Sequence, residues 1–347
     1  MHVKKQKKKR EKLGLLIDSK GELEYYLYPK FELTQSQKEI ATNILVIGET
    51  GVGKSTWINA LLNYIQDIEI EEDIRYLLFN EKEMKEEYEK IYGKKPKGGS
   101  VTDEPAIYNI KSNKLNYHPI RIIDTAGFGD TRGRGFDEKI NNDILKLFEN
   151  SEIENLNAIC LILKATETRA HDRFKYILSK LFSLFGEDIK NNIIIILTFV
   201  DSFNDDELPV INTLKDQTSL FSKILGDFDN LTHFSFNNNA YFTDNRNIFK
   251  DAYKNNTTNF ENFLNHVFSL ESISLKSTKE VINSRIQMKT SINNLFNSLD
   301  YIINDAKSAM NNKRTILEKQ NRLEILQNKV YPNKKYYCGF YDRKNRR

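Results

Sequence analysis

The feature that most constrains this chain is a glycine-rich loop between an apolar strand and a helix. Residues 43–47 (NILVI) have the pattern of a short buried strand, and residues 57–62 (WINALL) continue as a helix. Between them, residues 48–55 (GETGVGKS) match G-x-x-x-x-G-K-[ST]. Glycines let such a loop curl until its backbone N–H groups point at a phosphate chain, and the next helix adds its positive dipole end. We therefore expect a phosphate-binding loop here, and not merely a turn that caps a helix.

The loop residues have separate expected roles. Lys54 is expected to reach the β- and γ-phosphates of a nucleotide, and the hydroxyl of Ser55 to ligate Mg²⁺. The residues expected to surround the phosphates are Glu49, Thr50, Gly51, Val52, Gly53, Lys54, Ser55 and Thr56.

Strand and helix patterns alternate through most of the 347 residues. Strands are expected at 106–112, 118–124, 157–164, 192–200 and 232–237, the first two as a hairpin, and helices at 136–148, 172–185, 208–225 and 260–268. A helix is also expected over 69–93, and a short hairpin or strand within 18–33. This alternation predicts an α/β fold, a mostly parallel sheet sandwiched by helices, with ligands at the carboxyl ends of the strands.

Strand patterns stop after residue 271. Apolar residues recur there at helical spacing, which indicates one long helix or a helical hairpin, packed on the domain or on a second copy; a parallel coiled coil is a further alternative. We therefore expect a basic N-terminal extension (1–40), a nucleotide-binding domain (41–270), a helical extension (271–330) and a basic tail (331–347).

Charge and cysteine content exclude several classes of protein. The 52 basic and 48 acidic residues give a net charge of only +4, so we do not expect nucleic acid as a partner. Basic residues gather at both ends of the chain, which indicates solvated termini, or else a weak contact with a membrane surface, nuclear import or contact with RNA. No apolar run is long enough for a bilayer span, the basic N-terminus lacks the apolar stretch of a signal peptide, and two cysteines make no disulfide framework. A cytoplasmic location is expected.

A second motif, residues 124–127 (DTAG), ends a strand about 70 residues after the loop. Asp124 at this place is expected to hold Mg²⁺ through water, and the N–H of Gly127 to approach the γ-phosphate. Thr102 lies in a glycine-flanked segment and is expected to add its hydroxyl to Mg²⁺ and its N–H to the γ-phosphate, with Ser100 and Thr50 as alternatives. The residues expected to act in catalysis are Lys54, Thr102 and Gly127, and those expected at the metal are Ser55, Thr102 and Asp124.

Two further strand ends are expected to recognise the base. Thr198 and Asp201 follow the isoleucine-rich strand, and Asn237 and Asn238 follow the next one. A carboxylate accepts hydrogen bonds from the ring N–H and the amine of guanine, a pair of donors that adenine lacks. The alternative for Asp201 is a turn or helix cap.

Taken together, these motifs resemble those of the AIG/GIMAP-type immunity-associated GTPases, to which septins and chloroplast-import GTPases are related. The resemblance covers about residues 40–270 and depends chiefly on the phosphate loop and on residues 124–132 (DTAGFGDTR). It implies GTP and GDP as ligands with Mg²⁺, GTPase activity, and association of two copies through their nucleotide faces.

The chain departs from the usual pattern at two positions. Phe199 stands where the motif N-K-x-D has lysine, so selectivity for GTP over ATP is less secure, although a phenyl ring can stack on the base. Phe128 stands where Ras-like enzymes position water with glutamine, so slow intrinsic hydrolysis is expected. Arg132, Arg134 and Arg169 are candidates for a positive charge supplied by a second copy.

The sequence thus predicts a guanine-nucleotide switch that hydrolyses GTP slowly and is controlled by dimerisation or a partner. A septin-like scaffold, assembled under nucleotide control with little or no hydrolysis, is the alternative. An RNA- or membrane-binding protein that uses the basic ends is the third.

Overall fold

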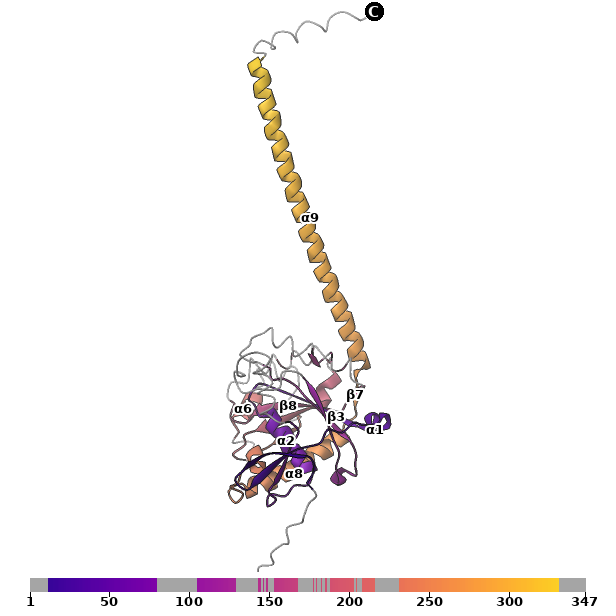
Figure 1. The fold of residues 1–347 in the computed structure, drawn as a ribbon, viewed down its shortest axis with the longest axis vertical. Helices are drawn as coiled ribbons and strands as arrows, with labels where there is room; N and C mark the ends of the chain where they lie inside the picture. The colour runs from indigo at the N-terminus through magenta and orange to yellow at the C-terminus, as the bar shows by residue number, and fades with distance from the viewer. Residues whose placement is uncertain are drawn as a thin grey trace, which may run out of the picture. The chain divides into compact units, whose positions relative to one another are not determined.

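A six-stranded sheet forms the centre of the unit made by residues 1–282 (Figure 1). The computed structural model describes residues 12–79, 105–128, 153–167, 188–202, 208–215 and 231–330, with a few single residues between them. The strands of the sheet are β3 (Thr42–Gly48), β5 (Ala106–Ile110), β6 (Ile120–Asp124), β8 (Ala158–Lys164), β9 (Ile193–Thr198) and β10 (His233–Ser235). Their order is β10-β9-β8-β3-β6-β5, and every pair is parallel except β5 with β6. The predicted α/β fold is confirmed.

The central strands are apolar throughout because both faces of the sheet are buried. In β3, Ile44 belongs to one hydrophobic core and its neighbour Leu45 to the other. The Ile44 side is covered by α2 (Lys54–Ile65) and α8 (Lys250–Ser269), which contact each other (Figure 1). Trp57 of α2 lies at the middle of this layer, fully buried among aromatic rings. The phosphate loop therefore joins two elements that are both held by the core.

A second, smaller sheet lies beside α2. It contains β1 (Leu15–Lys20), β2 (Leu23–Leu27) and β4 (Ile74–Leu77), in that order. The expected short hairpin is confirmed as β1 and β2. The expected helix over 69–93 is wrong at β4, where the backbone pairs in parallel with β2, and residues 80–93 lie outside the described part. Apolar residues at 74, 77 and 78 fit helical spacing, but pairing with a strand far away in the sequence decided the structure.

The remaining described elements are short. They are α1 (Gln35–Ile40), η1 (Asn113–Leu115), β7 (Asn155–Leu156), η2 (Asp188–Asn192), α6 (Pro209–Lys215), η5 (Asn238–Tyr241) and β11 (Ile273–Ser274). Strands β7 and β11 pair with each other in antiparallel fashion.

Beyond β11 the chain continues as one helix, α9 (Leu275–Val330). The chain divides into two compact units, residues 1–282 and 283–347, so α9 begins in the first unit and continues in the second. Leu275 is fully buried in the core of the first unit, and its N–H donates to the carbonyl oxygen of Glu154 at 2.8 Å. None of the helices that the structure describes is both long and apolar enough to cross a membrane.

Candidate functional site

The glycine-rich loop lies between β3 and α2, as its sequence pattern predicts. Gly51 and Gly53 have φ values of +80° and +88°, in the left-handed region that favours glycine. A Cβ atom added at Gly51 would meet no atom within 4 Å, so the loop stands clear of the described protein there. No described side chain caps α2 at Gly53, and the first N–H groups of the helix are therefore available to a ligand.

Lys54 is the buried cation of this loop. Only 7% of the residue is exposed, and its Nζ donates to the carbonyl oxygens of Gly48 at 3.1 Å and Glu49 at 3.0 Å. Burial lowers the pKa of Lys54 to about 8, while the nearby charges of Asp124 and Glu49 act in the opposite direction. The ammonium is thus held by carbonyl groups within the loop, where an anionic ligand would be favoured.

The segment 124–128 runs directly against the loop. Phe128 donates its N–H to the carbonyl of Gly48 at 3.1 Å, and its own carbonyl accepts from the N–H of Thr50 at 3.1 Å. A Cβ atom at Gly127 would lie 2.6 Å from the backbone of Thr50, so only glycine fits this approach. The side chain of Phe128 is 1% exposed and belongs to the hydrophobic core, so it presents no polar group to the loop.

Ser55 and Asp124 are the described residues expected at a metal ion. Asp124 is fully buried at the carboxyl end of β6, close enough to Lys54 to raise its pKa, and Ser55 is the next residue after Lys54. No cluster of three or more His, Cys, Asp or Glu able to hold a metal occurs among the described residues. One hydroxyl and one carboxylate nevertheless suit Mg²⁺ at a nucleotide, since phosphate oxygens and water supply the other ligands.

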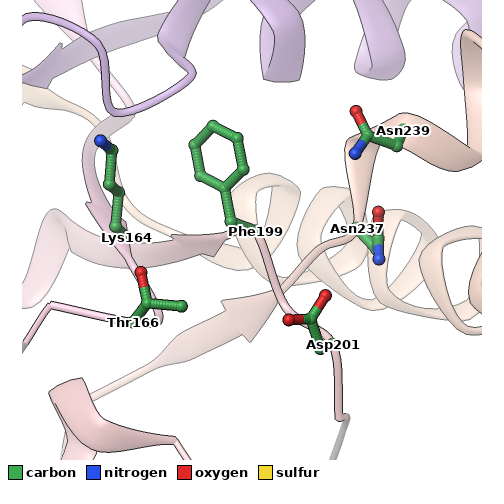
Figure 2. A pocket seen from close by; sticks show the side chains of 6 residues that line it. All are labelled: Lys164, Thr166, Phe199, Asp201, Asn237 and Asn239. Carbon is green, nitrogen blue, oxygen red and sulfur yellow. The ribbon is translucent and has the colours of Figure 1, made fainter.

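A cavity of about 290 Å³ opens beside the loop, at the carboxyl ends of three neighbouring strands. Its lining residues are Lys164 and Thr166 after β8, Phe199 and Asp201 after β9, and Asn237 and Asn239 after β10. Figure 2 shows the ring of Phe199 standing between Lys164 and Asn239, with the carboxylate of Asp201 below it. An aromatic face, a carboxylate and amide groups can together stack on a planar heterocycle and hydrogen-bond its edge.

Phe199 connects the cavity with the phosphate loop. Its ring is 45% exposed, and a Cβ atom at Gly53 would lie 3.3 Å from the ring edge. The φ of Phe199 is +56°, a left-handed conformation that is uncommon for an aromatic residue and costs roughly 1–3 kcal/mol. The Nζ of Lys164 lies 5.6 Å from the ring centroid, within the range of a cation–π contact.

Three residues fix the backbone around this cavity. Thr198 is fully buried and donates its hydroxyl to the carbonyl of Val52 at 2.6 Å or to that of Leu163 at 3.1 Å. Asn256 of α8, also fully buried, accepts from the N–H of Asn237 at 3.0 Å and donates to its carbonyl at 2.7 Å. Thr198 therefore lies beneath the loop, and Asn256 fixes the position of one wall.

The third of these residues is Arg75 of β4. Its guanidinium is fully buried and donates to the backbone carbonyl of Tyr241, where η5 ends, and to those of Glu72 and Ile74 at 2.7 Å each. The wall of the cavity that includes η5 is thus tied to the small sheet.

The structure places the predicted site residues unevenly. The loop residues, Asp124 and Gly127 come together at one place, and Asp201 and Asn237 line the cavity next to it. Asn238 is instead buried, because the chain turns into η5 there, and Asn239 lines the cavity. The predicted residues that lie outside the described part are Ser100, Thr102, Arg132, Arg134 and Arg169.

Sequence reasoning missed Lys164, Thr166, Asn256 and Arg75. The first two follow a strand that the sequence predicts to end at residue 164, so the rule that ligands bind at carboxyl strand ends was a usable signal. Asn256 lies among many asparagines, and nothing in its sequence neighbourhood marks it as buried.

A phosphate loop at the end of β3, followed by DTAG at the end of β6 and an aromatic–carboxylate cavity beside them, defines a phosphate-loop nucleotide-binding fold. Residues 42–250 match the AIG1 family. The chain therefore belongs to the AIG1 family.

Several known proteins are similar to parts of the chain. GTP-binding protein A of Dictyostelium discoideum is 24% identical over 47% of this chain and 29% of its own length. Immune-associated nucleotide-binding protein 8 of Arabidopsis thaliana is 26% identical over 55% of this chain and 46% of its own. The chain thus spans less than half the length of these curated relatives. The solved structure of Toc33 from Arabidopsis thaliana in complex with Mg²⁺ and GMPPNP is 14% identical, with a TM-score of 0.44 over 69% of this chain and 90% of that one.

Proposed function

We propose that this protein binds GTP and GDP with Mg²⁺ and hydrolyses GTP slowly, as a switch controlled by dimerisation or by a partner. The observation that carries the proposal is the phosphate loop, with Lys54 buried inside it and, next to it, a base-sized cavity lined by Phe199 and polar residues. The names of two relatives, a GTP-binding protein and an immune-associated nucleotide-binding protein, support nucleotide binding.

The triphosphate is proposed to lie across the loop and the start of α2. Gly51 leaves open space, the N–H groups of the first helical turn are uncapped, and Lys54 supplies a positive charge. Ser55 and Asp124 would hold Mg²⁺, which neutralises phosphate charge when it is bound. Thr102 is proposed as a further ligand of Mg²⁺.

The base is proposed to stack on Phe199, with Asp201 accepting hydrogen bonds from N1–H and the 2-amino group of guanine. Adenine offers neither donor at those places, so the carboxylate would be left unpaired against ATP. Lys164 places an ammonium in the same cavity, where the usual motif would supply its lysine from the position of Phe199. Asn237 and Asn239 would complete the polar rim.

Slow hydrolysis follows from the position of Phe128. Its side chain is in the core, so it cannot orient a water molecule as a glutamine would. The missing group is proposed to come from a partner or from a second copy that meets the nucleotide face, with Arg132, Arg134 and Arg169 as the candidates. A cytoplasmic location and a weak contact of the basic termini with anionic membrane also belong to the proposal.

Calorimetry with nucleotides that differ in their base tests the proposed recognition of guanine by Asp201. The wild-type protein should bind GTP and GDP in the presence of Mg²⁺ and bind ATP at least tenfold more weakly. Asp201→Asn replaces a hydrogen-bond acceptor by a donor. It should therefore weaken the binding of GTP and strengthen the binding of xanthosine triphosphate, whose 2-oxo group accepts a hydrogen bond. Equal affinity for ATP and GTP in the wild type, or an unchanged preference in Asp201→Asn, contradicts the proposed recognition of guanine.

A second candidate is a nucleotide-dependent assembly scaffold of the septin kind. The observation that favours it is the long helix α9, whose apolar side chains are exposed from Met288 to Val330. Sedimentation with GTP, GDP and no nucleotide separates the two functions. Assembly that depends on nucleotide while turnover is negligible favours the scaffold, and turnover that rises with protein concentration favours the switch.

A further inference from the structure

Helix α9 carries an exposed apolar stripe between Met288 and Val330. Every residue from Gln287 to Val330 is exposed. These include large apolar side chains such as Leu295 (64% exposed), Ile302 (60%) and Ile316 (56%). Exposed apolar residues in such a number are unusual for a surface that faces only water.

One row of the stripe follows a seven-residue repeat from Met288 to Val330. Every seventh residue, starting from Met288, is apolar. These residues are Met288, Leu295, Ile302, Ala309, Ile316, Leu323 and Val330. A second row, four residues after each of the first three, is Ile292, Leu299 and Ala306. This 3-4 spacing places both rows on one face, as positions d and a of a coiled coil.

The sequence of α9 is poorly suited to a helix that stands alone. It contains nine asparagines between residues 283 and 330, and asparagine is a weak helix former. The ion pair from Arg314 to Glu318 is exposed on both sides and is 3.6 Å long, which stabilises a helix only slightly. Long helices of this composition depend on packing of their apolar face. The stripe therefore requires a partner surface.

We propose that α9 pairs in parallel and in register with α9 of a second copy of this chain. A heptad stripe is complementary to itself, and in a parallel pair Lys319 at position g lies opposite Glu324 at position e of the partner helix, on both sides. Gln320 and Gln327, at two later a positions, meet their own copies only in this register and so penalise other registers, whereas Lys313 at the a position before them meets a like charge and weakens the pair. This pairing goes beyond the proposed function and does not depend on nucleotide.

The stripe is large enough for a stable pair. If each of the ten apolar side chains of the stripe removed about 60 Å² from water, two copies would bury roughly 1,200 Å². Specific protein interfaces bury about 1,200–2,000 Å² in total.

Light scattering of the full-length protein tests the pairing. The wild type should have the mass of two chains at micromolar concentration without nucleotide. The double variant Leu295→Lys with Ile302→Lys places two charges in the stripe and should have the mass of one chain. The matched control, Asn297→Lys with Asn304→Lys, adds the same charges on the opposite face of the helix and should stay dimeric.

Disulfide formation tests the parallel register. With Cys338→Ser in place, and Cys160 fully buried, Ile316→Cys should cross-link two chains rapidly under mild oxidation, because position d meets itself across a parallel pair. Asn311→Cys, on the opposite face, should cross-link at least tenfold more slowly. A monomeric wild type, a dimer that survives the stripe charges, or equal cross-linking of the two cysteine variants overturns the proposal.

Discussion

The two ends of the candidate site are built in different ways. At the phosphate end, backbone groups and glycines of the loop meet segment 124–128 through paired N–H and carbonyl groups, and one buried lysine adds charge. At the base end, side chains from three strand ends surround an open cavity, and their backbone is fixed by residues of other elements.

This difference explains why the sequence at the phosphate end matches the usual motifs, whereas the sequence at the base end departs from them. A backbone that binds phosphate depends on glycine at positions of left-handed φ or close approach, and few other sequences satisfy that geometry. A cavity made of side chains can keep its shape with other residues, as Phe199 and Lys164 illustrate. The phosphate end is therefore expected to tolerate substitution least.

Removing the buried cation should have the largest effect. Lys54→Met keeps most of the buried stem but loses the ammonium, and such losses cost about 2–5 kcal/mol, or ~30-fold to several-thousand-fold in affinity. The effect should fall on GTP and GDP and spare GMP, because Lys54 is expected to contact the β- and γ-phosphates. Lys164→Met is the matched control at the base end, and should weaken all three ligands by the same few-fold factor. If Lys54→Met bound GTP within twofold of the wild-type affinity, the expectation that the phosphate end tolerates substitution least would be contradicted.

Phe199→Gly should separate binding from stability. Glycine adopts the observed φ of +56° without strain, so thermal denaturation should give a melting temperature equal to or above that of the wild type. The loss of a stacking ring costs about 1–3 kcal/mol per base, so nucleotide affinity by calorimetry should fall about 5- to 150-fold. A variant that is less stable and binds normally would show that Phe199 is only a structural residue.

The pH dependence of binding should come from the phosphate end. The pKa of Lys54 is about 8 in the structure, so the ammonium is present below that pH and is lost above it. Anionic phosphates favour the protonated form, and GTP affinity should therefore fall by up to about tenfold for each pH unit above 8. Titrations from pH 7 to 9.5 measure this slope, and Lys54→Met should lack it. A flat profile in the wild type would show that Lys54 does not interact with the ligand as a cation.

Asn256→Ala should have the smallest effect, confined to the base end. It leaves the N–H and carbonyl of Asn237 without their partner, which costs about 1–3 kcal/mol of folding stability. The ratio of GTP to ATP affinity should fall severalfold, whereas affinity for inorganic pyrophosphate should not change. Asn255→Ala, one residue away and exposed, is the control and should match the wild type. Equal ratios of GTP to ATP affinity in the wild type and both variants would show that the cavity wall held by Asn256 does not contribute to selectivity.

Local patterns predicted most of the sheet and the phosphate end. The apolar runs of β3, β8 and β9 are continuous because these strands are buried on both faces, and such runs are visible in one sequence. The loop and DTAG are contiguous motifs, so spacing alone placed them at neighbouring strand ends.

Contacts between segments far apart in the sequence were not predictable in the same way. β4 forms because β2 lies beside it, and the helical spacing of its apolar residues gave the wrong element. Asn256 and Arg75 act on the cavity through bonds to backbone atoms across 19 and 166 residues of sequence, and such bonds leave no pattern. Asn238 turns inward because a 3₁₀ turn begins there, which a run of three asparagines does not indicate.

The bonds between Phe128 and the phosphate loop have a consequence for the entropy of binding. They extend the pairing of β3 with its neighbour past the ends of the strands, so the described loop already has a defined shape. Little conformational freedom of this loop is then left to lose when a phosphate chain arrives, and the free energy of the contacts appears almost entirely as affinity. Ordering costs would instead fall on side chains around the base, where Lys164 has many rotamers to give up.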